Sequence, residues 1–173
     1  MTSIPLNRQR SALGPSRVIA LVGLGCLALI AGAWFFEIVV GLRPCKLCLE
    51  QRLPHYAAMG LAAAGLVLAR SSRLQWLVLL GLAGLMVWST GLGVYHAGVE
   101  WGWFAGPNDC GGAAAPAAAG VQDFIKQLQT TRVVACTEAA WRWLGLSLAG
   151  WNAIASLGLL GLALLGLRGR TRG

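Results

Sequence analysis

Four long apolar blocks constrain the fold of this chain more than any other feature of its sequence. They cover residues 18–40, 53–69, 74–98 and 144–167. A helix rises about 1.5 Å per residue, so blocks of roughly 17–25 residues match the ~30 Å hydrocarbon core of a bilayer. The composition agrees, because 57% of the residues are hydrophobic and only 12% are charged. The sequence therefore predicts an all-α integral membrane protein, built as a bundle of four transmembrane helices.

The segments between the blocks indicate one membrane domain over residues 1–173. Only residues 70–73 separate the second block from the third, which leaves room for no more than a tight turn. The first block is longer than the apolar core of a secretory signal and lacks its small-residue cleavage pattern, so we expect it to be retained. The other segments are tails over residues 1–17 and 168–173, a short loop over 41–52 and a long loop over 99–143.

The basic residues are divided unequally between the two sides of the membrane. The side that holds both tails and the turn at residues 70–73 carries eight arginines and no acidic residue, whereas the other side carries six basic and six acidic residues. Cytoplasmic segments are enriched in Lys and Arg, so we expect both tails in the cytoplasm and both loops outside, where disulfides persist. The arginines form no cluster with interleaved aromatic residues, so nucleic-acid binding is not expected.

The long outer loop contains one stretch with helical periodicity. Within residues 121–134, apolar residues recur at positions 121, 124, 125 and 128, with polar residues between them. This pattern predicts a short amphipathic helix. A helix of this length is marginal in water, so we expect it to lie on the membrane surface.

Four cysteines lie in the two outer loops. Cys45 and Cys48 form a C-x-x-C pair after Pro44 in the short loop, and Cys110 and Cys136 lie in the long loop. Thiol–disulfide exchange requires a thiolate, a disulfide sulfur within reach and a leaving thiol of low pKa. The second apolar block begins next to the C-x-x-C pair, so helix N-terminal amides and Arg52 would favour a thiolate there.

The electron acceptor of such a pair is indicated by what the sequence lacks. It contains no glycine fingerprint for a flavin or nicotinamide, and only two histidines, His55 and His96, for any haem or metal. A C-x-x-C pair at the lipid boundary still requires an oxidant, and a membrane quinone is the natural one. The sequence thus predicts exchange between two dithiols and transfer of electrons to a quinone.

The chain resembles the DsbB family of bacterial inner-membrane disulfide-bond formation proteins over essentially its whole length. The resemblance lies in the four-block layout, in the C-x-x-C pair followed by Gln51 and Arg52, and in the spacing of the loop residues Pro107, Cys110, Cys136 and Trp141. The Ala/Gly-rich stretch after Cys110 is less distinctive than the loop of this family.

The resemblance implies a relay of disulfides. A Cys110–Cys136 disulfide would accept electrons from a DsbA-like periplasmic thioredoxin-fold oxidase, with Cys110 forming the mixed disulfide. Cys45 and Cys48 would reoxidise that pair, and Cys48 would pass the electrons to ubiquinone or menaquinone. Arg52 would polarise a quinone oxygen.

The same resemblance places His96 near the quinone, as in some members of the family. It also places the protein in the bacterial inner membrane as a multi-pass protein, with both termini cytoplasmic and the redox loops periplasmic. It assigns no metal to the protein.

Each of these residues also has a plainer interpretation. Cys45 and Cys48 could form a structural disulfide or part of a zinc site, although the sequence lacks a second C-x-x-C or a pair of neighbouring histidines. Cys110 and Cys136 could staple the loop, Arg52 could extend to the headgroups, and His96 could be a polar residue at a helix end. Cys26 lies in the middle of a block, where a cysteine is usually a small apolar side chain.

Two other functions therefore stay open at this point. One is the same chemistry dedicated to a particular client oxidase or substrate. The other is a membrane scaffold or transporter subunit whose outer loop carries inert disulfides. Reduction followed by addition of quinone separates the scaffold from the enzyme, because only the enzyme re-forms its disulfides at the expense of quinone.

Overall fold

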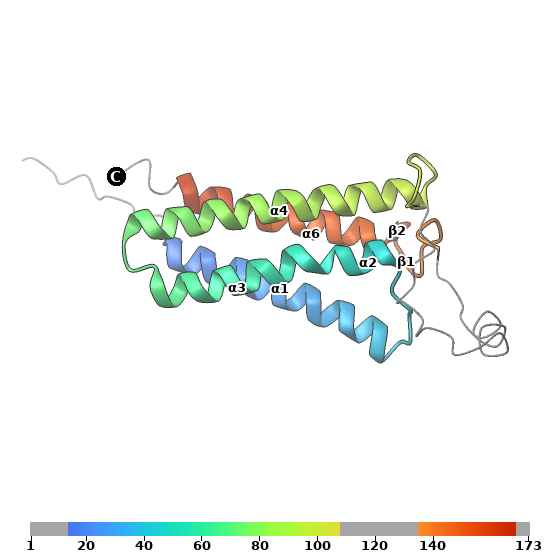
Figure 1. The fold of residues 1–173 in the computed structure, drawn as a ribbon, viewed down its shortest axis with the longest axis horizontal. Coiled ribbons are helices and arrows are strands. Elements are labelled where there is room, and N and C mark those ends of the chain that lie inside the picture. The colour runs from blue at the N-terminus through green and yellow to red at the C-terminus, as the bar shows by residue number, and fades with distance from the viewer. Residues whose placement is uncertain (1–13, 108–134, 169–173) are drawn as a thin grey trace, which may run out of the picture.

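The computed structural model describes residues 14–107 and 135–168. Over these residues the protein is a bundle of long helices that lie side by side (Figure 1). The long helices are α1 (Pro15–Ile38), α3 (Arg52–Leu68), α4 (Ser72–Glu100) and α6 (Leu148–Arg168). A short helix, α2 (Lys46–Glu50), leads into α3, and the strands β1 (Arg142–Trp143) and β2 (Leu146–Ser147) form an antiparallel hairpin before α6. Cys110, the predicted helix over residues 121–134 and most of both tails lie outside the described residues.

Three of the described helices are long and apolar enough to cross a membrane. These are α1, α4 and α6, with 24, 29 and 21 residues. Helix α3 has 17 residues, about 26 Å at the usual rise, which is slightly less than the hydrocarbon thickness. Only Gln51, itself in a helical conformation, separates α3 from α2. The protein is thus a helical membrane protein with three candidate spans, and the crossing of α3 stays a prediction.

The fourth apolar block starts later as a helix than its composition suggests. Leu144 and Gly145 have φ angles of 51° and 81°. Two consecutive residues with positive φ form the two-residue turn that suits a β-hairpin, and β1 and β2 flank them here. Helix α6 therefore begins at Leu148 rather than near residue 144.

Small residues let the helices approach closely. A Cβ atom on Gly93 would lie 2.9 Å from the Cβ and backbone nitrogen of Ala153, so α4 and α6 meet there with almost no side chain between them. Gly23 of α1 faces Ala62 of α3 in the same way. Association in lipid depends on packing rather than on a hydrophobic driving force, so such contacts are typical of membrane bundles.

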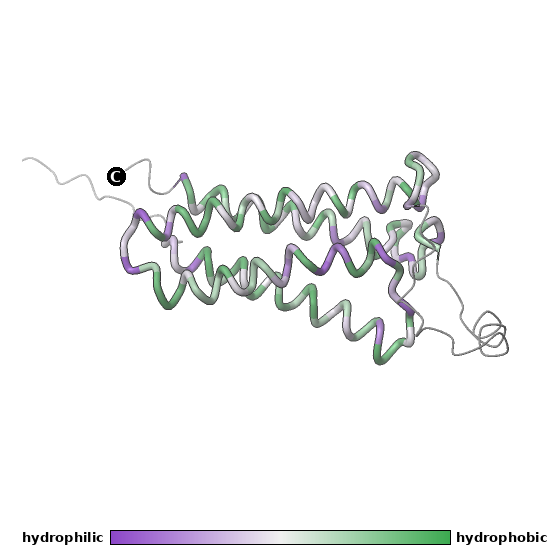
Figure 2. The backbone as a smooth tube through the Cα atoms, in the orientation of Figure 1, coloured by the Kyte–Doolittle hydropathy of each residue, from purple (hydrophilic) through white to green (hydrophobic). Residues whose placement is uncertain are grey.

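The outer face of the bundle is apolar along the helices. Leucines such as Leu24, Leu66 and Leu157 are more than one-third exposed. Figure 2 shows hydrophobic residues along the helices, while hydrophilic ones gather mainly at the ends and connections. A group of polar residues inside the bundle, near the α2–α3 joint, departs from this pattern, and it surrounds the site described next.

Candidate dithiol site

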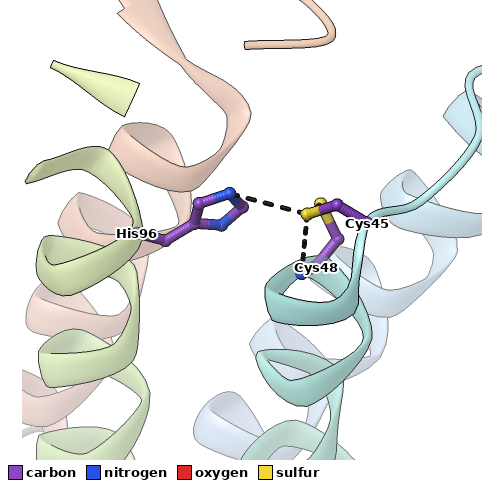
Figure 3. Close-up of side chains that lie close together, drawn as sticks. All are labelled: Cys45, Cys48 and His96. Atoms are coloured by element: carbon purple, nitrogen blue, oxygen red, sulfur yellow. Dashed lines mark hydrogen bonds between the residues drawn. The ribbon is translucent and has the colours of Figure 1, made fainter. Parts of the chain in front are cut away.

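The C-x-x-C pair caps the first turn of α2. Cys45 is the N-cap residue, and its sulfur accepts a hydrogen bond of 3.2 Å from the backbone N–H of Cys48. The two sulfur atoms lie 2.6 Å apart (Figure 3). Both cysteines are free thiols, Cys45 buried and Cys48 partly buried. The local fold thus holds two thiols in contact at a helix start, where backbone N–H groups stabilise negative charge.

The two thiols differ in acidity. The Cys45 thiol donates to the sulfur of Cys48, and this hydrogen bond lowers the pKa of Cys48 below its ordinary value. Arg52 acts in the same direction, while burial and Glu100 oppose it. The hydrogen bond to Cys48 and burial raise the pKa of Cys45. When the pair loses one proton, the negative charge is therefore favoured on Cys48.

Cys136 packs against this pair. It contacts the small cluster formed by Cys45, Leu47 and Val99, beside Tyr95 and Cys48. Cys136 is 88 residues from Cys48 in sequence, because α3 and α4 lie between them along the chain. Three of the four predicted cysteines thus meet at one end of the bundle, and Cys110 lies outside the described residues.

His96 reaches the thiols from α4. Its Nε2 atom lies 3.6 Å from the sulfur of Cys45 (Figure 3). The same atom lies 3.7 Å from Oε1 of Glu100. The side chain is buried. The structure therefore brings His96 to the dithiol as well as to the cavity beside it.

Two amide side chains complete this polar group. Gln51 Nε2 bonds Nδ1 of His96 at 2.5 Å, and Asn152 Nδ2 of α6 donates to Oε1 of Gln51 at 2.7 Å. The sequence interpretation used Gln51 only as part of a motif and did not single out Asn152. An amide inside an apolar block is a signal that could have identified it, because buried polar groups in membrane helices are costly and often functional.

A second polar group lies deeper in the bundle. Nδ1 of His55 donates to the backbone carbonyl of Gln51 at 3.0 Å. Ser89 and Ser156 are 2.9 Å apart and contact the His55 ring at 3.4 and 3.5 Å. All three side chains are fully buried, and each finds a partner within the bundle.

A cavity of about 340 Å³ opens beside Cys48. Its size falls within the range of small-molecule sites, and its composition is similar, with mostly apolar walls and a few polar groups. Helices α1, α3, α4 and α6 all contribute. Cys48 lines the cavity together with the polar residues Glu37, Arg43, Gln51, Arg52, His55, His96 and Asn152.

Arg52 is held in place at this cavity. Its guanidinium forms a 2.6 Å ion pair with Glu37 of α1 and lies 5.6 Å from the centre of the Trp34 ring. Its side chain is only 11% exposed. The Arg52 side chain therefore lies in the wall of the cavity and is not extended away from the bundle. The sequence interpretation missed Glu37 as its partner, because the two residues are on different helices.

The two sulfur atoms of Cys45 and Cys48 and a ring nitrogen of His96 lie within 4.8 Å of one another, close enough to bind a common metal ion. Among the described residues no fourth side chain joins this group, whereas structural zinc sites use four ligands. Gln51 donates to Nδ1 of His96, so the neutral ring carries its proton on Nε2, the atom that faces the sulfurs. In this tautomer the lone pair of Nε2 is not available to a metal ion, so metal binding would require the ring proton to move to Nδ1.

The fold and the site define a class: a helical membrane protein with a buried dithiol beside a cavity between its helices. Comparison with known proteins identifies the family. The sequence model described as "Disulfide bond formation protein DsbB" matches residues 15–166. The chain therefore belongs to the DsbB family of disulfide bond formation proteins.

Relatives of the same name cover nearly the whole chain. The "Disulfide bond formation protein B" of Verminephrobacter eiseniae is 37% identical, over 90% of this chain and 89% of the relative. That of Polaromonas sp. is 32% identical, over 91% and 95%. That of Dechloromonas aromatica is also 32% identical, over 84% and 88%. These relatives carry the same name as the matching family.

Proposed function

We propose that this protein is a dithiol:quinone oxidoreductase of the bacterial inner membrane. It takes two electrons from a DsbA-like periplasmic thioredoxin-fold oxidase and passes them to ubiquinone or menaquinone. The observation that carries the proposal is the position of Cys48, which contacts both the partner thiol Cys45 and the cavity that Arg52 lines. Electrons that arrive at the thiols can therefore leave through the cavity.

The size and lining of the cavity support the proposal of a quinone as its ligand. The cavity wall is mostly apolar, with many of the apolar side chains coming from α1 and α6, and Arg52 and Cys48 also line it. A quinone supplies a two-electron acceptor whose oxygens become negative as it is reduced. Arg52 would stabilise that charge, because a buried cation acts strongly where water is excluded.

The order of thiol exchange follows from the acidities and contacts. A thiolate of the reduced oxidase attacks Cys110 in a Cys110–Cys136 disulfide, and Cys136 leaves as a thiolate. Cys136 then attacks the sulfur of Cys45 in the Cys45–Cys48 disulfide. A Cys45–Cys136 disulfide forms, and the electron pair of the broken bond stays on Cys48 as a thiolate. Cys48 is the better leaving group because its pKa is lowered. Cys110 would receive the external oxidase, as the family resemblance implies.

The overall reaction balances. Two thiols of the reduced oxidase form one disulfide and release two electrons and two protons, and a quinone takes up two of each to become a quinol. Within the chain, the Cys110–Cys136 and Cys45–Cys48 disulfides are both broken and both re-formed, so the protein returns to its starting state. No metal ion takes part in the proposed reaction.

The two ends of the bundle support the proposed orientation. Arg70 of the α3–α4 connection, Arg73 of the first turn of α4 and Arg168 of α6 lie at one end, and the dithiol lies at the other (Figure 1). The acidic residues Glu37, Glu50, Glu100 and Glu138 belong to the dithiol end. By the positive-inside rule the arginine end would be cytoplasmic and the thiols periplasmic.

Quinone reduction by the purified protein tests this function. Full-length protein in detergent would receive a reduced thioredoxin-fold donor and a short-chain ubiquinone or menaquinone, and quinone absorbance would be followed. We expect one quinone to be consumed for each donor disulfide formed. A folded protein that accepts no electrons from the donor, or that re-forms its disulfides without consuming quinone, would show that its bridges are structural.

A further inference from the structure

Gln51 contacts both histidines of the chain. It joins α2 to α3, its side-chain amide bonds His96 of α4, and its backbone carbonyl accepts from His55 of α3. The chain contains only these two histidines. One residue thus determines which ring nitrogen carries the proton in each of them.

The tautomer of His96 follows from the direction of the amide bonds. Asn152 donates its Nδ2 hydrogen to Oε1 of Gln51, so Gln51 presents its Nε2 hydrogens to His96. Nδ1 of His96 must then accept, and the proton of the neutral ring lies on Nε2. The neighbours of Nε2 are the sulfur of Cys45 and a carboxylate oxygen of Glu100, both of which are acceptors.

The tautomer of His55 is the opposite one. Its Nδ1 lies 3.0 Å from the carbonyl oxygen of Gln51, and a carbonyl can only accept. Nδ1 of His55 therefore carries the proton, and Nε2 accepts from the hydroxyl of Ser156. Because the two tautomers differ, the ring-nitrogen shifts of each histidine can be compared with those of the other.

We propose that Gln51 and Asn152 are positioning residues that hold His96 with its proton on Nε2, so that His96 donates a hydrogen bond to the sulfur of Cys45. The inference rests on the proposed function for its chemical meaning but not for its test. Neither amide touches a reacting sulfur. Both act through His96, across a contact that joins residues 101 positions apart in sequence.

The hydrogen bond matters when Cys45 is the leaving group. When Cys110 attacks Cys136 in a Cys45–Cys136 disulfide, a Cys110–Cys136 bond forms and the Cys45–Cys136 bond breaks. The electron pair of the broken bond stays on Cys45 as a thiolate. The proton stays on Nε2 of His96, and this N–H group donates a hydrogen bond to the Cys45 thiolate. The backbone N–H of Cys48 donates a second one.

Nitrogen NMR of the reduced full-length protein, labelled with ¹⁵N-histidine, measures the tautomers directly. Protonated and unprotonated ring nitrogens have well-separated shifts. We expect two neutral rings of opposite tautomer, with His55→Gln used to assign them. This result requires neither quinone nor donor, so a failed activity assay would leave it standing.

The substitution Asn152→Asp should reverse the direction of the hydrogen bonds that link residue 152, Gln51 and His96. A carboxylate at position 152 accepts from Nε2 of Gln51, the amide of Gln51 turns over, and its oxygen then requires a proton on Nδ1 of His96. We expect the His96 shifts to invert and those of His55 to stay unchanged. Gln51→Leu, which removes the amide, provides a second variant and should give His96 a mixture of tautomers. Ser156→Ala, one turn further along α6, is the control and should leave the His96 shifts as they are.

Reactivity of Cys45 provides the chemical readout. In a Cys48→Ser background, the rate of alkylation of Cys45 at a fixed pH should fall roughly tenfold to a hundredfold with Asn152→Asp, the effect of losing a hydrogen bond to a charged sulfur. The proposal is overturned if His96 carries its proton on Nδ1 in the unmodified protein. It is also overturned if both Asn152→Asp and Gln51→Leu leave the His96 shifts unchanged.

Discussion

At the scale of residues, the site depends on a few charged and polar groups that the bundle removes from lipid. Arg52 is held between Glu37 and Trp34, beside the sulfur of Cys48. Burial makes each of these interactions stronger than it would be in water, and it makes an unpaired group costly. Replacing one of these groups therefore changes the chemistry at the cavity and also removes an interaction from its partner.

Replacement of Arg52 by Gln should mainly affect the quinone step. The cation at the cavity is lost, so we expect the apparent KM for quinone to rise by roughly tenfold or more, while reduction of the protein by its thiol donor changes little. Steady-state kinetics with varied quinone measure this. Arg70→Gln, at the opposite end of the bundle, is the matched control, and equal kinetics in the two variants would contradict the role of Arg52.

The acidity of Cys48 predicts the pH dependence of its alkylation. A pKa lowered by the Cys45 hydrogen bond means that the thiolate persists as pH falls below the ordinary thiol value of 9.0. Iodoacetamide should therefore modify Cys48 in the reduced protein at a pH where a free cysteine reacts slowly. Cys45→Ala removes the donor, so the midpoint of the profile should move to higher pH. A midpoint that did not move would show that Cys45 does not stabilise the thiolate.

At the scale of elements, the close approach of α4 and α6 brings His96 and Asn152 to opposite sides of Gln51. These two helices pack more extensively against each other than any other described pair. Gly93, one turn before His96, lies directly against Ala153, next to Asn152. The packing of one glycine thus sets the distance between two of the site residues.

Gly93→Ala should loosen the bundle and the site together. The new Cβ would lie 2.9 Å from the backbone nitrogen of Ala153, which cannot move without shifting α6. Overpacking of this kind costs about 1–3 kcal/mol, so thermal unfolding in detergent should occur at lower temperature. Gly84→Ala on the same helix is the control, since no atom lies within 4 Å of the added Cβ. A lower stability of Gly84→Ala than of Gly93→Ala would contradict this packing.

At the scale of the whole molecule, the proposed relay requires all reacting thiols on one side of the membrane. The described thiols Cys45, Cys48 and Cys136 meet at one end of the bundle, and the α3–α4 connection lies at the other. Whether α3 crosses the bilayer decides whether that connection reaches the cytoplasm. With 17 residues, α3 is the shortest of the four long helices.

A cysteine placed at Ser71 tests the crossing. In cells, Ser71→Cys should react with a membrane-impermeant maleimide only after the inner membrane is opened, because the α3–α4 turn is predicted to be cytoplasmic. The matched control is Thr137→Cys, next to Cys136, which should react in intact spheroplasts. Labelling of position 71 from the outside would show that α3 does not span the membrane in the predicted direction.

Local properties of the sequence determined where the long helices lie and where the dithiol lies. The apolar blocks predicted where α1, α3 and α4 lie, since a helix in lipid satisfies its own backbone, and the spacing of Cys45 and Cys48 predicted a dithiol at a helix start. The turn at Leu144 and Gly145 was missed, because a hairpin turn can be apolar too.

Only the tertiary structure decided which distant residues meet. The Arg52–Glu37 ion pair, the packing of Cys136 on Cys45 and the Gln51–Asn152 bond all join separate segments. Apolar helices carry the same pattern on every side that faces lipid or protein, so their sequences do not specify which faces pack together. The positions of small residues and the geometry of close packing make that choice.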